Sequence, residues 1–376
     1  FRAADLGLKV TLIDENHKLG GVCLNKGCIP SKSLLHASKL IDHSEEASKI
    51  GLKFEKPIID ISKMQDWKNS IIDNLNEGIY KLAKAREINI ITGRAKFLSA
   101  NQLEIADKQN KKLKLLFDNC IISTGSKPQK ISHLDKDHPS ILDSTSALNF
   151  KKIPKNILII GGGYIGLELG SVYNSLGAKV TIAEFLPSLL SMADEDLVKP
   201  LYQCLKTKFE NIYLSTEITS LVPQNDNNVI ATFKNKNKEF KDIFENILIC
   251  TGRTPNTLNL SIEKAGIKLD NKGFIPVNEQ MRTLIPNIFA IGDVTGAPML
   301  AHKATAEAKV AAEVISGRQN SFNPTAIPSV IYTNPEIAWA GLNEKELNEN
   351  KIKYIKSDFP WSASGRAMSV NATKGK

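Results

Sequence analysis

The pattern of apolar and polar positions predicts a strand-helix-strand unit in the middle of the chain. Residues 156–160 are a nearly continuous apolar run, which predicts a buried strand. Residues 167–176 have apolar positions at helical spacing, and residues 177–184 predict a second strand that ends in a carboxylate. Strands that alternate with helices in this way indicate an α/β fold with a parallel sheet.

The same pattern predicts further elements on both sides of this unit. A helix at the start ends at Gly7, and a short buried strand then runs to Asp14. Residues 119–126 and 246–256 both predict a strand followed by a Thr-Gly turn, which indicates two related nucleotide domains. The other predicted elements are a helix over 66–86, a meander of strands over 88–92, 95–98, 103–106 and 112–117, a crossover over 128–150 with Ser144 as a helix cap, a strand over 288–291, a helix over 299–317 and a β-rich unit over 328–340.

A glycine-rich loop joins the first strand and the helix of the central unit. Gly161, Gly163 and Gly166 form the Gly-x-Gly-x-x-Gly pattern, which permits a tight turn and the close approach of a pyrophosphate to the helix N-terminus. The strand, loop, helix and second strand together make a complete dinucleotide fingerprint. Glu184 ends the second strand, where a carboxylate pairs with a free ribose 2′-hydroxyl and repels a 2′-phosphate, so NAD is favoured over NADP.

Cys23 and Cys28 flank a short loop that leads into a predicted helix. Gly27 frees the backbone before the second thiol, and Pro30 suits the first turn of a helix. Cys28 and Lys32 then share a face, and a nearby positive charge favours the thiolate that thiol–disulfide exchange requires. A structural zinc site and an inert structural disulfide are the alternatives. Zinc would need two further ligands, and the other cysteines are scattered, while an inert disulfide is unusual in a chain without secretory features.

Composition narrows the classes of protein. The 376 residues suffice for two or three domains, and 42% hydrophobic and 24% charged residues are ordinary for a globular enzyme. We find no apolar run long enough for a bilayer and no signal peptide, and we expect no membrane insertion. The net charge of +9 comes from lysines spread among acidic residues, so we expect no nucleic-acid partner. Five cysteines, an odd number, indicate a reducing compartment, and we expect no bound metal.

Three further positions have both a structural and a functional interpretation, and a fourth, Asp293, has a functional one. Asp14 would bind the ribose of a dinucleotide, although many strands end in Asp. The turn over 124–126 can bring the backbone close to a nucleotide or be a plain turn. Glu168, on the first turn of the predicted helix, can stabilise the helix dipole or face a flavin site. Asp293 would hold a polyol hydroxyl of a cofactor.

In their order along the chain, these motifs resemble the pyridine nucleotide-disulfide oxidoreductases. The resemblance rests on Gly-Gly-Val-Cys-Leu-Asn-Lys-Gly-Cys-Ile-Pro-Ser-Lys, Ser-Thr-Gly-Ser, Gly-Gly-Gly-Tyr-Ile-Gly-Leu-Glu-Leu-Gly, Ile-Gly-Asp, Met-Leu-Ala-His and Tyr-Thr-Asn-Pro-Glu-Ile-Ala-Trp. It implies an α/β chain with two Rossmann-like FAD- and NAD(P)-binding domains of three-layer β/β/α architecture and the start of an α+β dimerisation domain. The implied boundaries are 1–126 for the FAD domain, 127–255 for the NAD domain, 256–322 for a return to the FAD domain and 323–376 for the interface domain.

The resemblance also implies roles for individual residues. Cys28 would lie beside the flavin, Cys23 would exchange with the substrate, and Lys32 would sit near flavin N5, paired with Glu168. Tyr164 would occupy a position that can cover the flavin where nicotinamide docks. The implied FAD contacts are Asp14, Lys32, the backbone of Ala95, Thr124, Gly125, Ser126, Asp293, Met299, Leu300, Ala301 and His302. The implied NAD contacts are Gly161, Gly162, Gly163, Tyr164, Ile165, Gly166, Leu167, Glu168, Glu184, Ile218 and Gly252.

Within the family, the Leu-Asn and Ile-Pro-Ser-Lys residues of the redox motif resemble members that act on protein-bound dihydrolipoamide rather than on glutathione. The implied reaction reoxidises dihydrolipoamide with NAD+, and the implied partners are the lipoyl domain of an acyltransferase in a 2-oxoacid dehydrogenase complex and a second copy in a homodimer. We expect a cytoplasmic protein, or a mitochondrial-matrix one in a eukaryote. The alternatives are a flavin disulfide reductase of the mercuric or glutathione type and a non-catalytic docking subunit.

Both ends of the chain look cut. The family's first glycine-rich loop would precede Phe1, and its acid–base His with a Glu partner would follow Lys376. We therefore expect a fragment that binds FAD poorly and turns over little. His302 does not take the acid–base role, because it fits the Met-Leu-Ala-His flavin contact.

Overall fold

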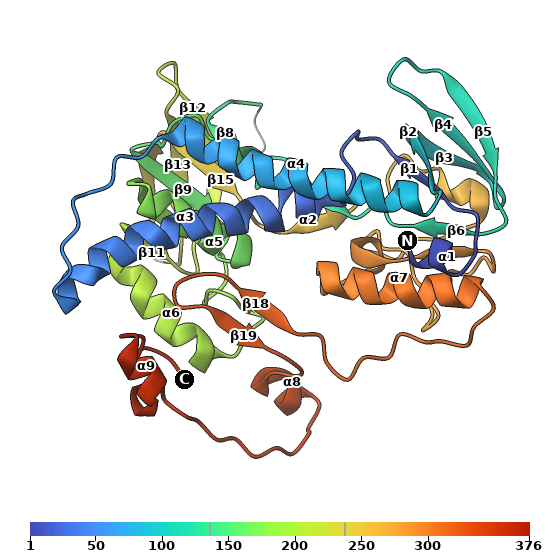
Figure 1. Ribbon diagram of the computed structural model, residues 1–376. Coiled ribbons are helices and arrows are strands. Elements are labelled where there is room, and N and C mark those ends of the chain that lie inside the picture. The colour runs from blue at the N-terminus through green and yellow to red at the C-terminus, as the bar shows by residue number, and fades with distance from the viewer. Residues whose placement is uncertain (135–136, 237) are drawn as a thin grey trace. The chain divides into compact units, whose positions relative to one another are not determined.

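The computed structural model describes residues 1–134, 137–236 and 238–376. These residues form two compact units, each assembled from segments that are far apart in the sequence (Figure 1). The first unit comprises Phe1–Asn25, Ser70–Lys127 and Arg253–Thr325. The second comprises Lys26–Asn69, Pro128–Gly252 and Ala326–Lys376.

The first unit combines two parallel strand pairs with an antiparallel meander. Its strands are β1 (Thr11–Asp14), β2 (Asn89–Thr92), β3 (Arg94–Ser99), β4 (Gln102–Ala106), β5 (Lys112–Leu116), β6 (Cys120–Ile122), β16 (Arg253–Pro255), β17 (Ile288–Ala290) and the first two residues of β7 (Ser126–Pro128). β1 pairs in parallel with β2, and β6 with β17, while β3, β4 and β5 form the meander. The helices of this unit are α1 (Arg2–Asp5), η3 (Ile262–Ala265), η4 (Gly292–Thr295) and α7 (Ala301–Ile315). Two helices, α2 (Gly21–Lys26) and α4 (Ile61–Ala85), contain residues of both units.

The two faces of β17 show that the core of the first unit has three layers. Ile288 and Ala290 pack with Phe97 and Leu103 of the meander. The alternate residue Phe289 packs on the other side, with apolar residues of α7. Side chains of a strand point alternately to its two faces, so the order of layers is meander, parallel strands and helix. This is the predicted β/β/α architecture.

The second unit is built around a five-stranded parallel sheet of order β11-β10-β9-β15-β8 (Figure 1). Its strands are β8 (Ile141–Leu142), β9 (Asn156–Ile160), β10 (Lys179–Ala183), β11 (Asn211–Tyr213), β12 (Glu217–Pro223), β13 (Val229–Lys234), β14 (Glu239–Phe244), β15 (Asn246–Ile249), β18 (Ser329–Ile331) and β19 (Ile337–Trp339). β12, β13 and β14 form an antiparallel sheet, and β18 and β19 form a separate antiparallel pair. The helices are α3 (Cys28–Glu46), η1 (Ala47–Ile50), η2 (Ser146–Leu148), α5 (Tyr164–Ser175), α6 (Glu195–Lys208), α8 (Glu344–Glu349), η5 (Trp361–Ala363) and α9 (Gly365–Ser369).

β9 shows why the second unit has the same layering. Ile157 and Ile159 pack in a core shared with α3, α5 and α6, whereas Leu158 and Ile160 pack against the β12-β13-β14 sheet. A central strand covered on both faces needs apolar side chains at every position, and this explains the continuous apolar run. The predicted three-layer architecture is therefore confirmed in both units.

Several predicted elements are wrong in their limits or partners. α4 begins at Ile61, five residues before the predicted start, and α5 begins at Tyr164 rather than at residue 167. The strand over 88–92 is not part of the meander, because β2 pairs in parallel with β1. β1 itself is partly exposed rather than buried.

The predicted cap at Ser144 is also wrong. The helix in question is η2, and the Asp143 Oδ1 accepts the backbone N–H groups of Thr145 at 2.9 Å and Ser146 at 2.7 Å. A carboxylate accepts such hydrogen bonds more strongly than a neutral hydroxyl does. The N-cap residue of η2 is Thr145, and the crossover that contains η2 also contributes β8 to the parallel sheet.

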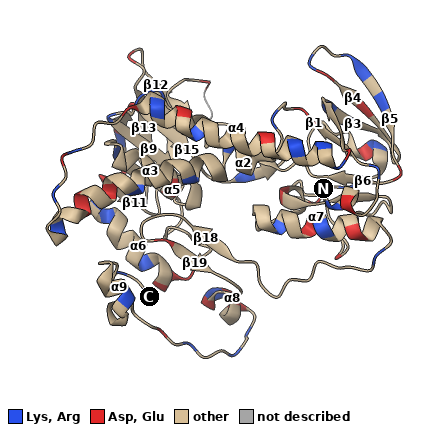
Figure 2. Ribbon diagram, in the orientation of Figure 1, with Lys and Arg blue, Asp and Glu red and all other residues tan. Residues whose placement is uncertain are grey.

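Charged residues of both signs occur along α3, α4 and α7 (Figure 2). Ion pairs between them, such as Lys81 with Glu77 at 2.7 Å, account for part of this mixture. Among the residues that the structure describes, no helix is both long and apolar enough to cross a membrane.

Candidate functional site

The glycine loop of the second unit folds as a tight strand-to-helix connection. Gly161 has a φ of +110°, and a Cβ at this position would lie only 2.6 Å from the carbonyl oxygen of Cys250. A Cβ on Gly166 would collide with the carbonyl oxygen of Gly161. Both positions therefore require glycine, which leaves the backbone close to the N-terminus of α5 open to a pyrophosphate.

Glu184 lies directly after β10 and is fixed beside this loop. Its Oε2 accepts the backbone N–H of Gly162 at 2.5 Å, and its Oε1 accepts that of Leu186 at 2.7 Å. β9 lies between β10 and β15, so the loop opens where the chain order of the sheet reverses. Open parallel sheets bind dinucleotides at such a position, at the carboxyl ends of the strands.

Cys23 lies in α2 and Cys28 begins α3, and the two sulfurs form a disulfide. The zinc-site alternative does not describe this pair, because each sulfur is bonded to the other. Within the described ranges, no group of three or more His, Cys, Asp or Glu side chains is placed to hold a metal ion. Burial raises the pKa of Cys120 to about 12 and also raises the pKa of Cys250, so these thiols stay protonated at neutral pH and are poor nucleophiles.

Lys32, one turn along α3 from Cys28, forms an ion pair with Glu168 of α5. The Lys32 Nζ lies 2.9 Å from Oε2 and 3.1 Å from Oε1 of Glu168. The Glu168 side chain is 4% exposed and that of Lys32 is 32% exposed. Because α5 begins at Tyr164, Glu168 is in the second turn of the helix and not in the first. The helix dipole has little effect on a carboxylate beyond the first turn. The structure thus brings together Lys32 and Glu168, the pair that the resemblance implied.

Hydrogen bonds in the first unit join the turn over 124–126 to Asp293 and to the turn over 253–256. The Ser126 hydroxyl donates to the Asp293 carboxylate, and Arg253 donates to the Ser126 hydroxyl and to its carbonyl oxygen, both at 2.7 Å. The Thr124 hydroxyl donates to the carbonyl oxygen of Asn256 at 2.8 Å. Sequence reasoning missed Arg253, although its place directly after the second Thr-Gly turn could have indicated it.

A buried ion pair fixes the same region from the side of α7, and sequence reasoning also missed it. The Lys303 Nζ lies 2.7 Å from Glu307, and both side chains are less than 10% exposed. Glu307 also accepts the backbone N–H of Gly292 at 2.6 Å, next to Asp293. The spacing of four residues was visible in the sequence, but it is equally common on solvated helix faces.

The remaining predicted positions lie at strand ends, in loops or in a core. Asp14 ends β1 and accepts the backbone N–H of Asn16 at 2.8 Å, and Ala95 pairs with Ile105 in the meander. Met299 and Leu300 precede α7, and Ala301 and His302 begin it. Gly252 follows β15 with a φ of +142°, whereas the Ile218 side chain is buried in the core of the second unit.

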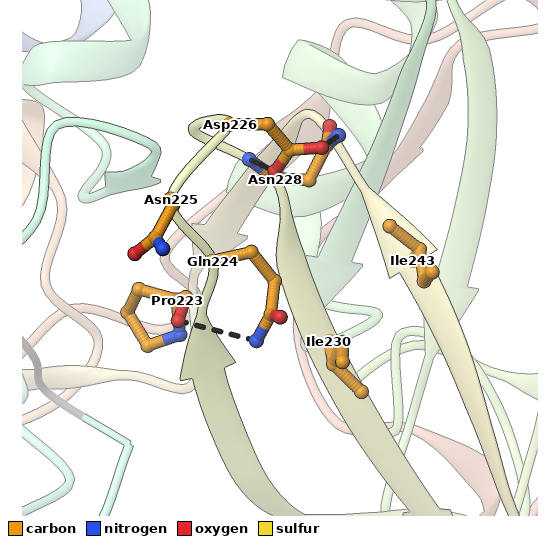
Figure 3. A pocket seen from close by; sticks show the side chains of 7 residues that line it. All are labelled: Pro223, Gln224, Asn225, Asp226, Asn228, Ile230 and Ile243. Carbon is orange, nitrogen blue, oxygen red and sulfur yellow. Dashed lines mark hydrogen bonds between the residues drawn. The ribbon is translucent and has the colours of Figure 1, made fainter.

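Figure 3 shows a hollow at the turn between β12 and β13. Seven residues line it: Pro223, Gln224, Asn225, Asp226, Asn228, Ile230 and Ile243. None of them is a predicted site residue, and Gln224 and Asp226 use their side chains in local hydrogen bonds. We therefore place no candidate site at this hollow.

These features define a dinucleotide-binding protein with a disulfide that can undergo thiol–disulfide exchange. The family model of the pyridine nucleotide-disulphide oxidoreductases matches residues 1–308, and the model of their dimerisation domain matches residues 327–376. The chain belongs to the pyridine nucleotide-disulphide oxidoreductase family. Members of this family use FAD and NAD(P), and the match to the dimerisation domain supports a homodimer.

Two similar curated proteins are named dihydrolipoyl dehydrogenase. One from Buchnera aphidicola subsp. Schizaphis graminum is 47% identical over 100% of this chain and 79% of its own length. One from Vibrio cholerae is 44% identical over 100% of this chain and 78% of its own length.

Solved structures support the same fold. The HOCl-induced flavoprotein disulfide reductase RclA from Escherichia coli, as a Cu(II) complex, is 26% identical with a TM-score of 0.83, covering 100% of this chain and 82% of that one. LpdA from Mycobacterium tuberculosis is 20% identical with a TM-score of 0.90, covering 99% of this chain and 82% of that one, and it shows the fold alone.

Proposed function

We propose that this protein oxidises protein-bound dihydrolipoamide with NAD+, through the Cys23–Cys28 disulfide and FAD. The observation that carries the proposal is that disulfide, at the start of the helix whose next turn presents Lys32 to Glu168. The relatives named dihydrolipoyl dehydrogenase support this choice of substrate, because they match the whole chain.

Thiol–disulfide exchange explains the chemistry of the pair. A thiolate of the substrate dithiol attacks the Cys23 sulfur, the Cys23–Cys28 bond breaks, and Cys28 leaves as a thiolate. The second substrate thiol, once deprotonated, attacks the substrate sulfur of the mixed disulfide and releases Cys23 as a thiolate. The substrate thereby becomes a cyclic disulfide, and the cysteine pair holds two electrons. Bound FAD would supply the two-electron acceptor that connects this dithiol to NAD+.

The residues proposed to hold the two cofactors come from loops, strand ends and helices of both units. For FAD we propose Asp14, Lys32, the Ala95 backbone, the turn of Thr124, Gly125 and Ser126, Asp293, and the residues Met299, Leu300, Ala301 and His302. For NAD we propose the glycine loop with Tyr164, Ile165, Leu167 and Glu168, together with Glu184, Ile218 and Gly252. The buried side chain of Ile218 leaves only its backbone for such a contact.

We also propose the partners and the compartment. The substrate carrier is the lipoyl domain of an acyltransferase in a 2-oxoacid dehydrogenase complex, and the working enzyme is a cytoplasmic homodimer. The predicted limits of the domains, at residues 126, 255 and 322, remain part of this proposal.

Two assays on the purified full-length holoenzyme test the function. We expect rapid NADH formation from dihydrolipoamide and NAD+, and little NADPH oxidation with glutathione disulfide. A preference for glutathione disulfide and NADPH would overturn the choice of substrate. Absence of flavin absorbance from the purified full-length protein would favour a docking subunit without catalysis.

Glu184→Ala should weaken NAD+ binding about tenfold, which corresponds to about 1.4 kcal/mol, and should reduce the preference over NADP+. The carboxylate that pairs with a ribose hydroxyl and repels a 2′-phosphate is lost, together with the acceptor for the Gly162 N–H. KM values for both nucleotides measure the change. Glu184→Gln is the matched control, since it keeps an acceptor oxygen without the charge, and it should relax selectivity with a smaller loss of NAD+ affinity. Unchanged selectivity in both variants would remove the carboxylate argument.

A further inference from the structure

Tyr332 follows β18, in the segment that matches the dimerisation domain, and it contacts both members of the Lys32–Glu168 pair. Its backbone N–H donates to Glu168 Oε1 at 3.1 Å. Its ring centroid lies 4.4 Å from the Lys32 Nζ. All three residues belong to the second unit.

The two contacts stabilise opposite charges of one ion pair. A buried carboxylate loses its hydration, and Glu168 recovers hydrogen bonds from Lys32 and from the Tyr332 backbone. An ammonium within about 6 Å of a tyrosine ring is attracted by the negative face of the ring. The Lys32 ammonium therefore has the Glu168 carboxylate and the Tyr332 ring as two separate attractive neighbours.

A second contact docks the same segment without touching Lys32. Lys39 lies seven residues after Lys32 on α3, and it forms an ion pair with Glu336, four residues after Tyr332. Positions seven apart on a helix share a face, so the segment is held to α3 at two points. Docking of the segment and placement of the Lys32 charge can therefore be separated by mutation.

We propose that Tyr332 is a positioning residue whose ring holds the Lys32 ammonium beside Glu168. The inference rests on the proposed function, in which Lys32 faces the flavin. Lys32 is partly exposed, so without the ring its flexible chain can move the ammonium toward solvent. A positive charge close to a flavin favours its reduced form, so loss of the ring lowers the reduction potential of the bound flavin.

Four holoenzymes test this role: wild type, Tyr332→Leu, Tyr332→Phe and Glu336→Gln. The first measurement is the rate at which a water-soluble amine reagent labels Lys32, read by mass spectrometry, and the second is the flavin midpoint potential. A cation–π contact of about 0.5–1 kcal/mol predicts a twofold to fivefold faster labelling of Lys32 in Tyr332→Leu, with a lower potential. Tyr332→Phe keeps the ring, and Glu336→Gln perturbs only the docking contact, so both should resemble wild type.

Replacement of Tyr332 by pentafluorophenylalanine provides a second test that keeps the shape of the ring. Fluorination inverts the charge distribution of the ring face, so Lys32 in this protein should be labelled faster than in the wild type. The test therefore remains possible if Tyr332→Leu fails to fold. Labelling and potential that stay at the wild-type values in both proteins would overturn the proposal. Changes in Glu336→Gln equal to those in Tyr332→Leu would also overturn it, because segment docking alone would explain them.

Failure of the proposed function gives a different result. If the wild-type holoenzyme did not oxidise dihydrolipoamide while Tyr332→Leu still exposed Lys32 and lowered the potential, the positioning role would stand for another disulfide substrate. If dihydrolipoamide turned over while labelling and potential were unchanged in the variants, the positioning role alone would fail.

Discussion

Cys23→Ser is expected to lower dihydrolipoamide oxidation by at least about a thousandfold, as loss of a residue that forms the covalent intermediate does in other enzymes. The variant cannot form the Cys23–Cys28 disulfide, so the substrate thiolate has no sulfur–sulfur bond to attack. Steady-state NADH formation and the flavin absorbance of the purified variant measure the effect. Flavin should stay bound, because Cys23 is not among the residues proposed to hold FAD.

Cys204→Ser is the matched control for this prediction. Cys204 is a free thiol of the second unit, and its Sγ lies 3.3 Å from the carbonyl oxygen of Asn334, an acceptor that serine can also reach. Its turnover should equal that of the wild type. Normal turnover in Cys23→Ser would contradict the redox assignment, and equal losses in both variants would indicate a general effect of removing a thiol.

The nucleotide fingerprint was predictable because local sequence determines it. β9 begins and ends at the predicted residues, and β15 begins at the predicted one, since a strand buried on both faces must be apolar throughout. The start of α4 was not predictable in the same way. Its first residues, Ile61 and Met64, are apolar positions that pack on the core of the second unit, and only the fold shows that contact.

The site residues also divide into those that local sequence indicates and those that only the fold reveals. Motifs that are continuous in the sequence, such as the glycine loop and the cysteine pair, were found. Arg253, Tyr332 and the Lys303–Glu307 pair were missed, because their roles depend on partners that the fold supplies or on burial. Tyr332, for example, is separated from Glu168 by 164 residues. A single sequence contains no periodic pattern that indicates a contact between two residues so far apart.

Lys68 of α4 is a further residue whose environment only the fold reveals. Its Nζ donates to Gln65 Oε1 at 2.6 Å, and to the Leu148 carbonyl and Asn149 Oδ1 at 2.8 Å each. These acceptors are neutral, and Lys68 as a whole is 0% exposed. Burial therefore lowers the pKa of Lys68 to about 8, from 10.5 for a solvated lysine.

This shift predicts a stability that rises with pH. Below about pH 8 both the folded and the unfolded chain hold the proton, and the cost of burying the ammonium is fully present. Between the folded pKa of about 8 and the unfolded pKa of 10.5, only the unfolded chain binds the proton, so the free energy of unfolding increases. The contribution of Lys68 amounts to about 2 kcal/mol between pH 8 and pH 10.

Lys68→Met isolates that contribution, because methionine keeps an apolar stem and does not titrate. Urea unfolding of both proteins at pH 8, 9 and 10 should show the wild type gaining about 2 kcal/mol relative to the variant. Lys63→Met is the control on the same helix, since its side chain is 87% exposed and should show no such change. A difference between wild type and Lys68→Met that stays constant with pH would mean that the three hydrogen bonds keep the Lys68 ammonium charged. In that case the hydrogen bonds, and not burial, would determine the protonation of this lysine.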